Sequence, residues 1–144
     1  MEEKTQQKRE AWDWSKHRPN NMFNINTTPE RNFFKWWCTF LKPFVPLTPK
    51  ERDVVAAYLK QRFELAKVIS DPIVLDSQLM STTTKDKVIE ECNMTLQHYY
   101  VVMSSLRKSN VITEAGINPK LIPSIKKDDN GTFQLLINFN GVTI

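Results

Sequence analysis

Side chains that could carry chemistry are few in this sequence, and their spacing fits no metal or nucleophile site. The two histidines are His17 and His98, and the two cysteines are Cys38 and Cys92. Neither histidine stands at a metal-ligand spacing from a cysteine. Both cysteines lie in apolar surroundings, where a free thiol behaves as a small hydrophobic group. We therefore expect two buried, reduced thiols, no disulfide framework, no metal site and no cofactor.

Carboxylates and glycines also fail to indicate an enzyme. Glu90 and Glu91 are adjacent, and neighbouring residues on a helix diverge by about 100° around its axis. The 3 glycines of the chain leave no glycine-rich loop to hold phosphates. No arrangement of Ser, His and Asp stands out. The sequence predicts a protein that is not an enzyme and takes no small-molecule substrate.

Nucleic-acid contacts are the remaining chemistry that the residues offer. The net charge is +4 with a pI near 9.1, which is a weak basic signal. Gln97 has the side chain that pairs with adenine, and Lys108 could neutralise a phosphate. Val101 interrupts the same helix face, and the acids Asp128 and Asp129 balance the basic pair that precedes them. The candidate DNA-contacting residues are Gln97, His98, Ser104, Arg107, Lys108, Lys126 and Lys127.

Three helices would position these residues. Thr48 begins a capping box with Glu51, and Pro49 suits the first helical position, so a helix is predicted from there to about Ile69. The pair Asp71-Pro72 should stop it. A short helix is predicted over 84–92, capped from the serine and threonine run 81–84. After a turn at 93–94, a third helix follows from Thr95 to about 109–110, with Leu96, Tyr99, Tyr100, Met103 and Leu106 directed inward.

The C-terminal part has the pattern of β structure. Val111-Ile112 is a short apolar strand, and the runs 121–125 and 132–139 are apolar or alternating. Asn130-Gly131 between them is a strong hairpin signal. The order of helix, short helix, turn, helix, strand and hairpin predicts an α+β fold: a winged helix-turn-helix domain over 46–144, with three helices and a C-terminal hairpin wing.

The N-terminal part divides into a polar arm, 1–29, and an aromatic-rich helix, 30–45. Thr28 and Pro29 suit the start of that helix, and Pro43 should end it. Its aromatics occupy nearly every side, so it packs either against its own domain or against another subunit; a membrane-surface position is a third alternative. The candidate subunit-interface residues are Trp12, Trp14, Phe33, Phe34, Trp36, Trp37, Phe40 and Phe44.

No membrane association is otherwise indicated. Residues 1–21 are polar and contain no apolar core of a signal peptide. No stretch approaches the roughly 20 apolar residues that span a bilayer. We expect a soluble protein that is kept in cytoplasm-like conditions.

Two resemblances follow from these motifs. The segment "KDKVIEECNMTLQHYYVVMSSLRKSNVI" resembles the second and third helices of winged-helix proteins. The whole order, with "FFKWWCTFLKPF", "LTPKERDVVAAYL" and "INPKLIP", is similar to small virion proteins of crAss-like tailed bacteriophages, some of which form rings in the portal-to-tail assembly.

The second resemblance implies a structural head-tail connector protein in the virion, assembled in the host cytoplasm. Its partners would be copies of itself in a cyclic ring and other virion proteins; the copy number stays open. The alternative is a winged-helix transcription or replication regulator that dimerises through the aromatic helix and binds DNA. A winged-helix fold does not by itself imply DNA binding, since one fold serves many functions. The low positive charge of the third helix therefore favours contacts with protein over contacts with DNA.

Overall fold

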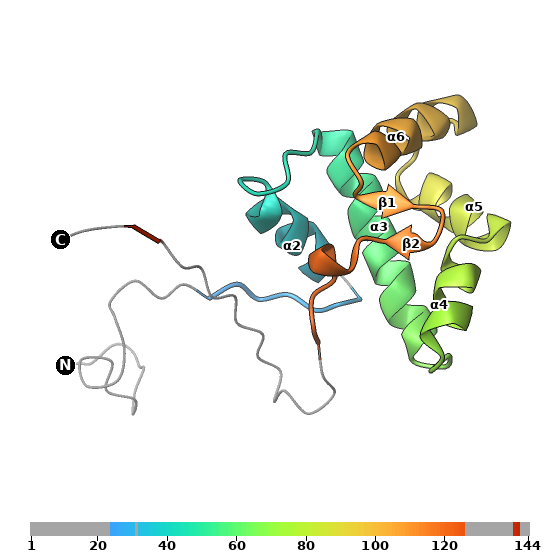
Figure 1. Ribbon diagram of the computed structural model, residues 1–144, viewed down its shortest axis with the longest axis horizontal. Coiled ribbons are helices and arrows are strands. Elements are labelled where there is room, and N and C mark those ends of the chain that lie inside the picture. Colours follow the sequence, from blue (N-terminus) through green and yellow to red (C-terminus); the bar gives the residue numbers. More distant parts are fainter. Residues whose placement is uncertain (1–23, 31, 126–139, 142–144) are drawn as a thin grey trace.

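The computed structural model describes residues 24–30, 32–125 and 140–141. Within these residues the fold is mixed, with five α-helices and a two-stranded antiparallel sheet, as the predicted α+β class requires (Figure 1). The elements are α2 (Phe33–Leu41), α3 (Pro49–Ala66), α4 (Pro72–Leu79), α5 (Thr82–Glu91), α6 (Leu96–Lys108), β1 (Ile112–Thr113), β2 (Gly116–Ile117) and the 3-10 turn η1 (Pro119–Leu121).

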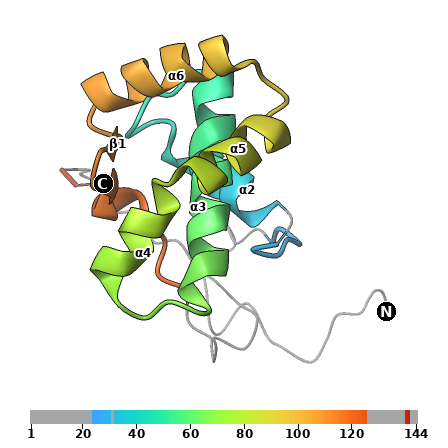
Figure 2. The same ribbon diagram turned by 90° about the vertical axis from the view of Figure 1, so that its right-hand side faces the viewer.

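Helix α3 is the centre of the molecule. Its predicted capping box is confirmed: the Thr48 hydroxyl accepts a hydrogen bond from the Glu51 amide at 3.2 Å, and the Glu51 carboxylate accepts one from the Thr48 amide at 2.8 Å. Every residue from Val54 to Leu59 is buried, because other helices surround this part of α3. Helix α2 lies on one side, α4 and α5 lie on the other, and α6 crosses the N-terminal end (Figures 1 and 2).

A pair of buried tyrosines joins α3 to α6. The hydroxyl groups of Tyr58 and Tyr99 are hydrogen-bonded to each other inside the core. Burial, more than any other factor, raises the pKa of both phenols. Both rings are therefore neutral and supply a polar contact inside the core.

Helix α4 is absent from the sequence-based prediction. The pair Asp71-Pro72 was expected to stop a helix, and α3 does end before it, at Ala66 rather than near Ile69. The same pair also begins α4: the Asp71 carboxylate accepts a hydrogen bond from the Ile73 amide at 2.9 Å, and Pro72 takes the first helical position. The predicted count of three helices after residue 46 is therefore wrong, since the described residues of this range already contain four α-helices.

Helices α5 and α6 follow one another across a short turn, close to the two helices predicted over 84–92 and from Thr95. Ser81 caps α5 and Thr95 caps α6, each accepting a hydrogen bond from an amide of the first turn. Asn93 turns the chain between the helices with φ of +52°, a conformation that asparagine tolerates better than most residues. Two inward assignments on α6 are wrong, because Leu96 and Tyr100 are exposed, whereas Val102, which was not assigned inward, is buried.

A short hairpin follows α6. Strand β1 pairs with β2 in the register Ile112↔Ile117 and Thr113↔Gly116, and these strands pack on α6 and α4 respectively. Gly116 has φ of +135°, and a Cβ there would lie 3.2 Å from the Asp76 carboxyl group of α4. Glycine is thus required at this position both by the backbone and by the close approach of α4.

The predicted strand over 121–125 is not formed. Pro119 begins the η1 turn, where the Asn118 side chain accepts a hydrogen bond from the Lys120 amide at 3.1 Å. Pro119 and Pro123 lack the N–H group that a sheet ladder needs. The run 132–139, the turn at Asn130-Gly131 and the basic pair Lys126 and Lys127 lie outside the described residues.

Helix α2 is shorter than the predicted aromatic helix over 30–45. It begins at Phe33, and the Thr28 side chain does not cap it. The backbone carbonyl oxygen of Thr28 instead accepts a hydrogen bond from the Phe33 amide. It ends at Leu41, before Pro43, as predicted. Among the described residues, no helix combines the length and apolar character needed to cross a membrane.

Candidate interaction surfaces

Helix α2 and the turn that follows it expose three large aromatic side chains, Trp36, Phe40 and Phe44, which we call the α2 aromatic face. Their exposed fractions are 42%, 42% and 64%. The Trp36 and Phe40 rings stack, with centroids 6.0 Å apart and an interplanar angle of 28°. These two residues are four apart and lie on the same side of the helix, whereas Phe44 lies in the turn after it. Three of the predicted interface aromatics are therefore exposed in this part of the molecule.

The remaining aromatics of α2 attach it to the body. Phe34 is buried in the core and contacts Phe63 of α3 with ring centroids 5.9 Å apart, so it does not belong to the exposed face. The Trp37 indole N–H donates a hydrogen bond to the Leu121 carbonyl oxygen at 2.7 Å. Phe33 and Trp37 are half-buried against the core. These contacts hold α2 in place, and the α2 aromatic face is therefore presented on a fixed helix.

A second exposed strip lies on the side of α6 opposite its buried residues, and Ser105 at its edge contacts the start of α3. Tyr99, Val102, Met103 and Leu106 are buried on the inner side, which leaves the opposite residues to solvent. The residues of this α6 outer face are Leu96, Tyr100, Val101, Ser104, Ser105 and Lys108. Tyr100 and Val101 are 51% and 67% exposed, so the face is apolar at its N-terminal half.

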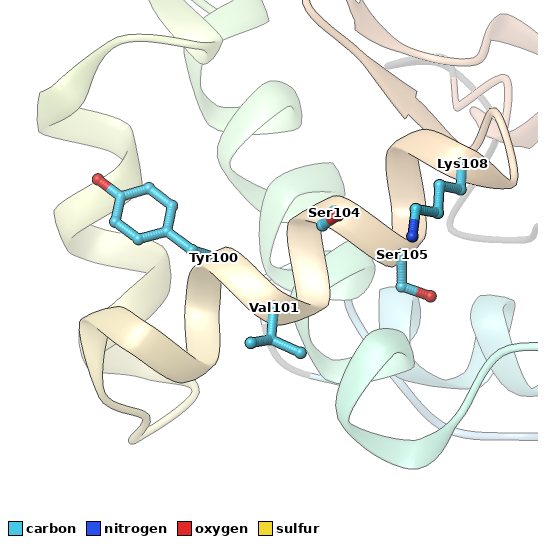
Figure 3. A pocket seen from close by; sticks show the side chains of 5 residues that line it. All are labelled: Tyr100, Val101, Ser104, Ser105 and Lys108. Atoms are coloured by element: carbon cyan, nitrogen blue, oxygen red, sulfur yellow. The ribbon is translucent and has the colours of Figure 1, made fainter.

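The α6 outer face contains a shallow hollow. It is lined by Tyr100, Val101, Ser104, Ser105 and Lys108, all from α6 itself. Figure 3 shows Tyr100 extending away at one end, while the Lys108 ammonium group bends back toward the turn that carries the two serines. The hollow arises because two small serines stand between larger side chains.

Glu51 fixes the position of this face relative to α3. Its carboxylate accepts a hydrogen bond from the Ser105 hydroxyl of α6 in addition to the one from the Thr48 amide. Burial alone would raise the pKa of Glu51, but the hydrogen bonds from Ser105 and Thr48 outweigh it and hold the pKa below its ordinary value of 4.5. The group is therefore ionised at neutral pH and serves as a charged acceptor for both helices.

The candidate DNA-contacting residues of α6 are all exposed: Gln97, His98, Ser104, Arg107 and Lys108. The apolar pair Tyr100 and Val101 interrupts them. Lys85 of α5 is directed to Tyr100, with its ammonium 3.3 Å from the hydroxyl and 5.6 Å from the ring centroid. The face thus combines apolar and basic groups and does not form a uniform phosphate-binding surface.

A third apolar patch was not found from the sequence. Val68 follows α3, and Ile73 and Val74 begin α4; the first two are 82% and 81% exposed. The patch can be found only if α4 is predicted, and from the sequence Asp71-Pro72 is interpreted only as the end of the preceding helix. The preference of aspartate for the position just before a helix is the signal that could have revealed α4.

Within the described residues, the side chains with nucleophilic or metal-binding potential are not assembled into a metal site. Cys38 and Cys92 are free and buried, and burial raises the pKa of these thiols to about 12 and about 11. In the part of the chain that the structure describes, no group of three histidine, cysteine or acidic side chains is placed to hold a metal ion. His17, Trp12 and Trp14 lie outside the described residues.

Comparisons with protein-family models, with curated proteins and with solved structures found no match to this chain. Its function is therefore inferred from the surfaces themselves.

Proposed function

We propose that this chain is a non-enzymatic structural subunit that binds neighbouring copies of itself and other proteins in a cyclic assembly. The observation that carries the proposal is the α2 aromatic face, where Trp36 and Phe40 of α2 and Phe44 of the following turn are exposed beside contacts that hold the helix to the body. Tryptophan and phenylalanine are enriched where protein surfaces meet and supply much of the binding energy there.

The binding energy that the α2 aromatic face can supply fits a subunit that makes several contacts and not one. Burying the exposed parts of the three rings would stabilise a complex by roughly 2–5 kcal/mol, taking about half of the value for complete burial of each. Association itself costs about 4–15 kcal/mol in lost freedom of motion. The α2 aromatic face is therefore too small to hold two copies alone. A closed ring, in which each subunit makes further contacts, meets the requirement.

The virion assignment rests on the resemblance to ring proteins of crAss-like tailed bacteriophages. Under that assignment the assembly is the head-tail connector, and its neighbours are other virion proteins. The winged form of the helix-turn-helix is part of the same proposal, and α5 and α6 supply its two central helices.

The test is the absolute mass of the full chain by light scattering across a concentration series. We expect concentration-dependent assembly, and we expect Phe40→Ser to reduce it because an aromatic anchor is lost. Val68→Ser is the matched control, since it removes an exposed apolar side chain from another surface. A chain that stays monomeric at every concentration, or a Phe40→Ser variant that assembles like the original, contradicts the proposal.

A DNA-binding regulator is the second candidate. The observation that favours it is the exposure of Gln97 and His98 at the N-terminal end of α6, where helix-turn-helix proteins contact base edges. This function requires salt-dependent affinity for duplex DNA that falls uniformly across sequences in Lys108→Ala. Repeating the mass measurement with a short duplex at low salt separates the two candidates.

A further inference from the structure

We propose that the α6 outer face binds the segment Trp12-Asp13-Trp14 of a neighbouring copy. This inference rests on the proposed function, because it supplies the second contact that the α2 aromatic face requires. It concerns a different helix and a different partner segment, so the two can fail separately.

The shape of the α6 outer face suits large flat side chains. The hollow is lined by the small Ser104 and Ser105 and by the larger Tyr100, Val101 and Lys108, all of which project from α6 (Figure 3). Tyr100 and Val101 are more than half exposed, so their apolar surface is available to a ligand. An indole ring placed over the serines would contact these side chains edge to edge and cover apolar area that water now reaches.

The charges of this face also favour tryptophan with an adjacent acid. An ammonium group over an aromatic ring gives its strongest attraction with tryptophan. Lys85 already lies 5.6 Å from the Tyr100 ring centroid, which shows that this surface holds cations beside aromatics. Lys108 stands at the other end of the hollow. A carboxylate between two indoles would be attracted to both lysines. The acid that contacts this face, Glu51, is already bonded to Ser105 and Thr48 and is largely buried.

The sequence of this chain contains such a segment. Trp12 and Trp14 flank Asp13, and the three residues lie outside the described part of the chain. In an extended segment, residues two apart lie on the same side and are separated by about 6.6 Å. One helical turn of α6, from Tyr100 to Ser104, advances by about 6 Å. The two indoles thus match the spacing of Tyr100 and the serine hollow.

The source of the segment is a second copy, because an arm bound to its own body would add no contact between subunits. Position 24 is ten steps along the chain from position 14, so an extended connection reaches at most about 36 Å. This length allows an arm to cross from one subunit to the next. Exchange of such arms around a ring would link every subunit to its neighbour.

The experiment is photo-crosslinking in the assembled full-length chain, with p-benzoyl-phenylalanine in place of Val101. Copies that carry the probe are mixed with copies labelled with nitrogen-15. We expect crosslinks between the probe and the peptide containing residues 12–14 of the labelled copies. Trp12→Ala combined with Trp14→Ala should lower their yield at least about tenfold, since the indoles supply most of the contact. The control places the probe at Val68, which is exposed on another surface and should not capture this peptide.

A reciprocal probe at position 14 guards against disturbance of α6 by the substitution, and it should capture the peptide containing 100–108. Crosslinks confined to the same copy overturn the inference, as do crosslinks from position 101 to added duplex DNA in place of the arm. A chain that assembles through the α2 aromatic face but gives no crosslink with either probe overturns this inference alone. A chain that never assembles overturns the proposed function as well.

Discussion

The Ser105 hydroxyl of α6 donates a hydrogen bond to the Glu51 carboxylate at the start of α3. The same carboxylate accepts the Thr48 amide and completes the capping box of α3. One side chain therefore begins the central helix and also sets how α6 lies across its end. Ser105 also lines the hollow on the α6 outer face, so the contact joins this hollow to the start of α3.

We expect Glu51→Gln to destabilise the fold at pH 7 by about 0.5–1.5 kcal/mol, the usual contribution of a hydrogen bond. The pKa of Glu51 is lower in the folded chain than its ordinary value of 4.5, so its stabilising contribution is complete above pH 4.5. It is lost as the pH falls through the folded value. Urea unfolding of both proteins at pH 7 and pH 3 should therefore show a difference that narrows at pH 3. A difference that is constant or larger at pH 3 would show that the charge is not involved.

Gly116→Ala should destabilise the fold by about 1–3 kcal/mol, because φ of +135° is open to glycine almost alone. The added methyl would also lie 3.2 Å from the Asp76 carboxyl group. Repeating the substitution in an Asp76→Ala background should lower its cost, while the backbone part remains. Urea unfolding midpoints of the original chain, the two single variants and the double variant give the coupling energy between positions 116 and 76. Equal costs in the two backgrounds would show that the contact with Asp76 is unimportant.

Trp37→Phe should destabilise the fold by about 1–3 kcal/mol, because it leaves the buried Leu121 carbonyl without its indole donor at 2.7 Å. The matched control is Trp36→Phe on the same helix, which should change stability by at most about 0.5 kcal/mol in the monomer. Unfolding is followed by circular dichroism at low protein concentration. Similar losses in both variants would place the anchoring of α2 elsewhere.

Both thiols should resist modification in the folded chain. The pKa of Cys38 is about 12 and that of Cys92 about 11, so at pH 8 the reactive thiolate of Cys92 is on the order of one part in a thousand. We expect slow labelling by a disulfide reagent, with Cys92 before Cys38, and two labels per chain after unfolding in urea. Cys92→Ala identifies the slower site. Rapid labelling of one thiol in the native chain would contradict the burial of that residue.

Local signals in the sequence predicted the helices best. Thr48, Ser81 and Thr95 each accept a first-turn amide hydrogen bond, and each stands where the sequence placed or allowed a cap. Such caps depend only on neighbouring residues, which explains why sequence reasoning found them. Asp71 obeys the same rule, but the Pro72 beside it can both end a helix and begin one.

Tertiary contacts decided what the sequence could not. Tyr100 and Val102 are both largely apolar side chains and lie two residues apart on α6. Val102 is buried and Tyr100 is exposed because of how α6 packs on the rest of the fold, which the sequence alone does not give. The sequence grouped the aromatics of α2 as one candidate interface, but the division between anchors such as Phe34 and exposed residues such as Phe40 depends on which side meets α3.

The hydrogen bond between Tyr58 and Tyr99 has a consequence for how this sequence can diverge. Each buried hydroxyl has the other as its partner, so a change of one to phenylalanine leaves a polar group stranded, whereas a change of both restores an apolar interface. Related sequences should therefore keep or lose the two hydroxyls together. Because position 58 lies on α3 and position 99 on α6, such paired changes would trace the packing of these helices through evolution.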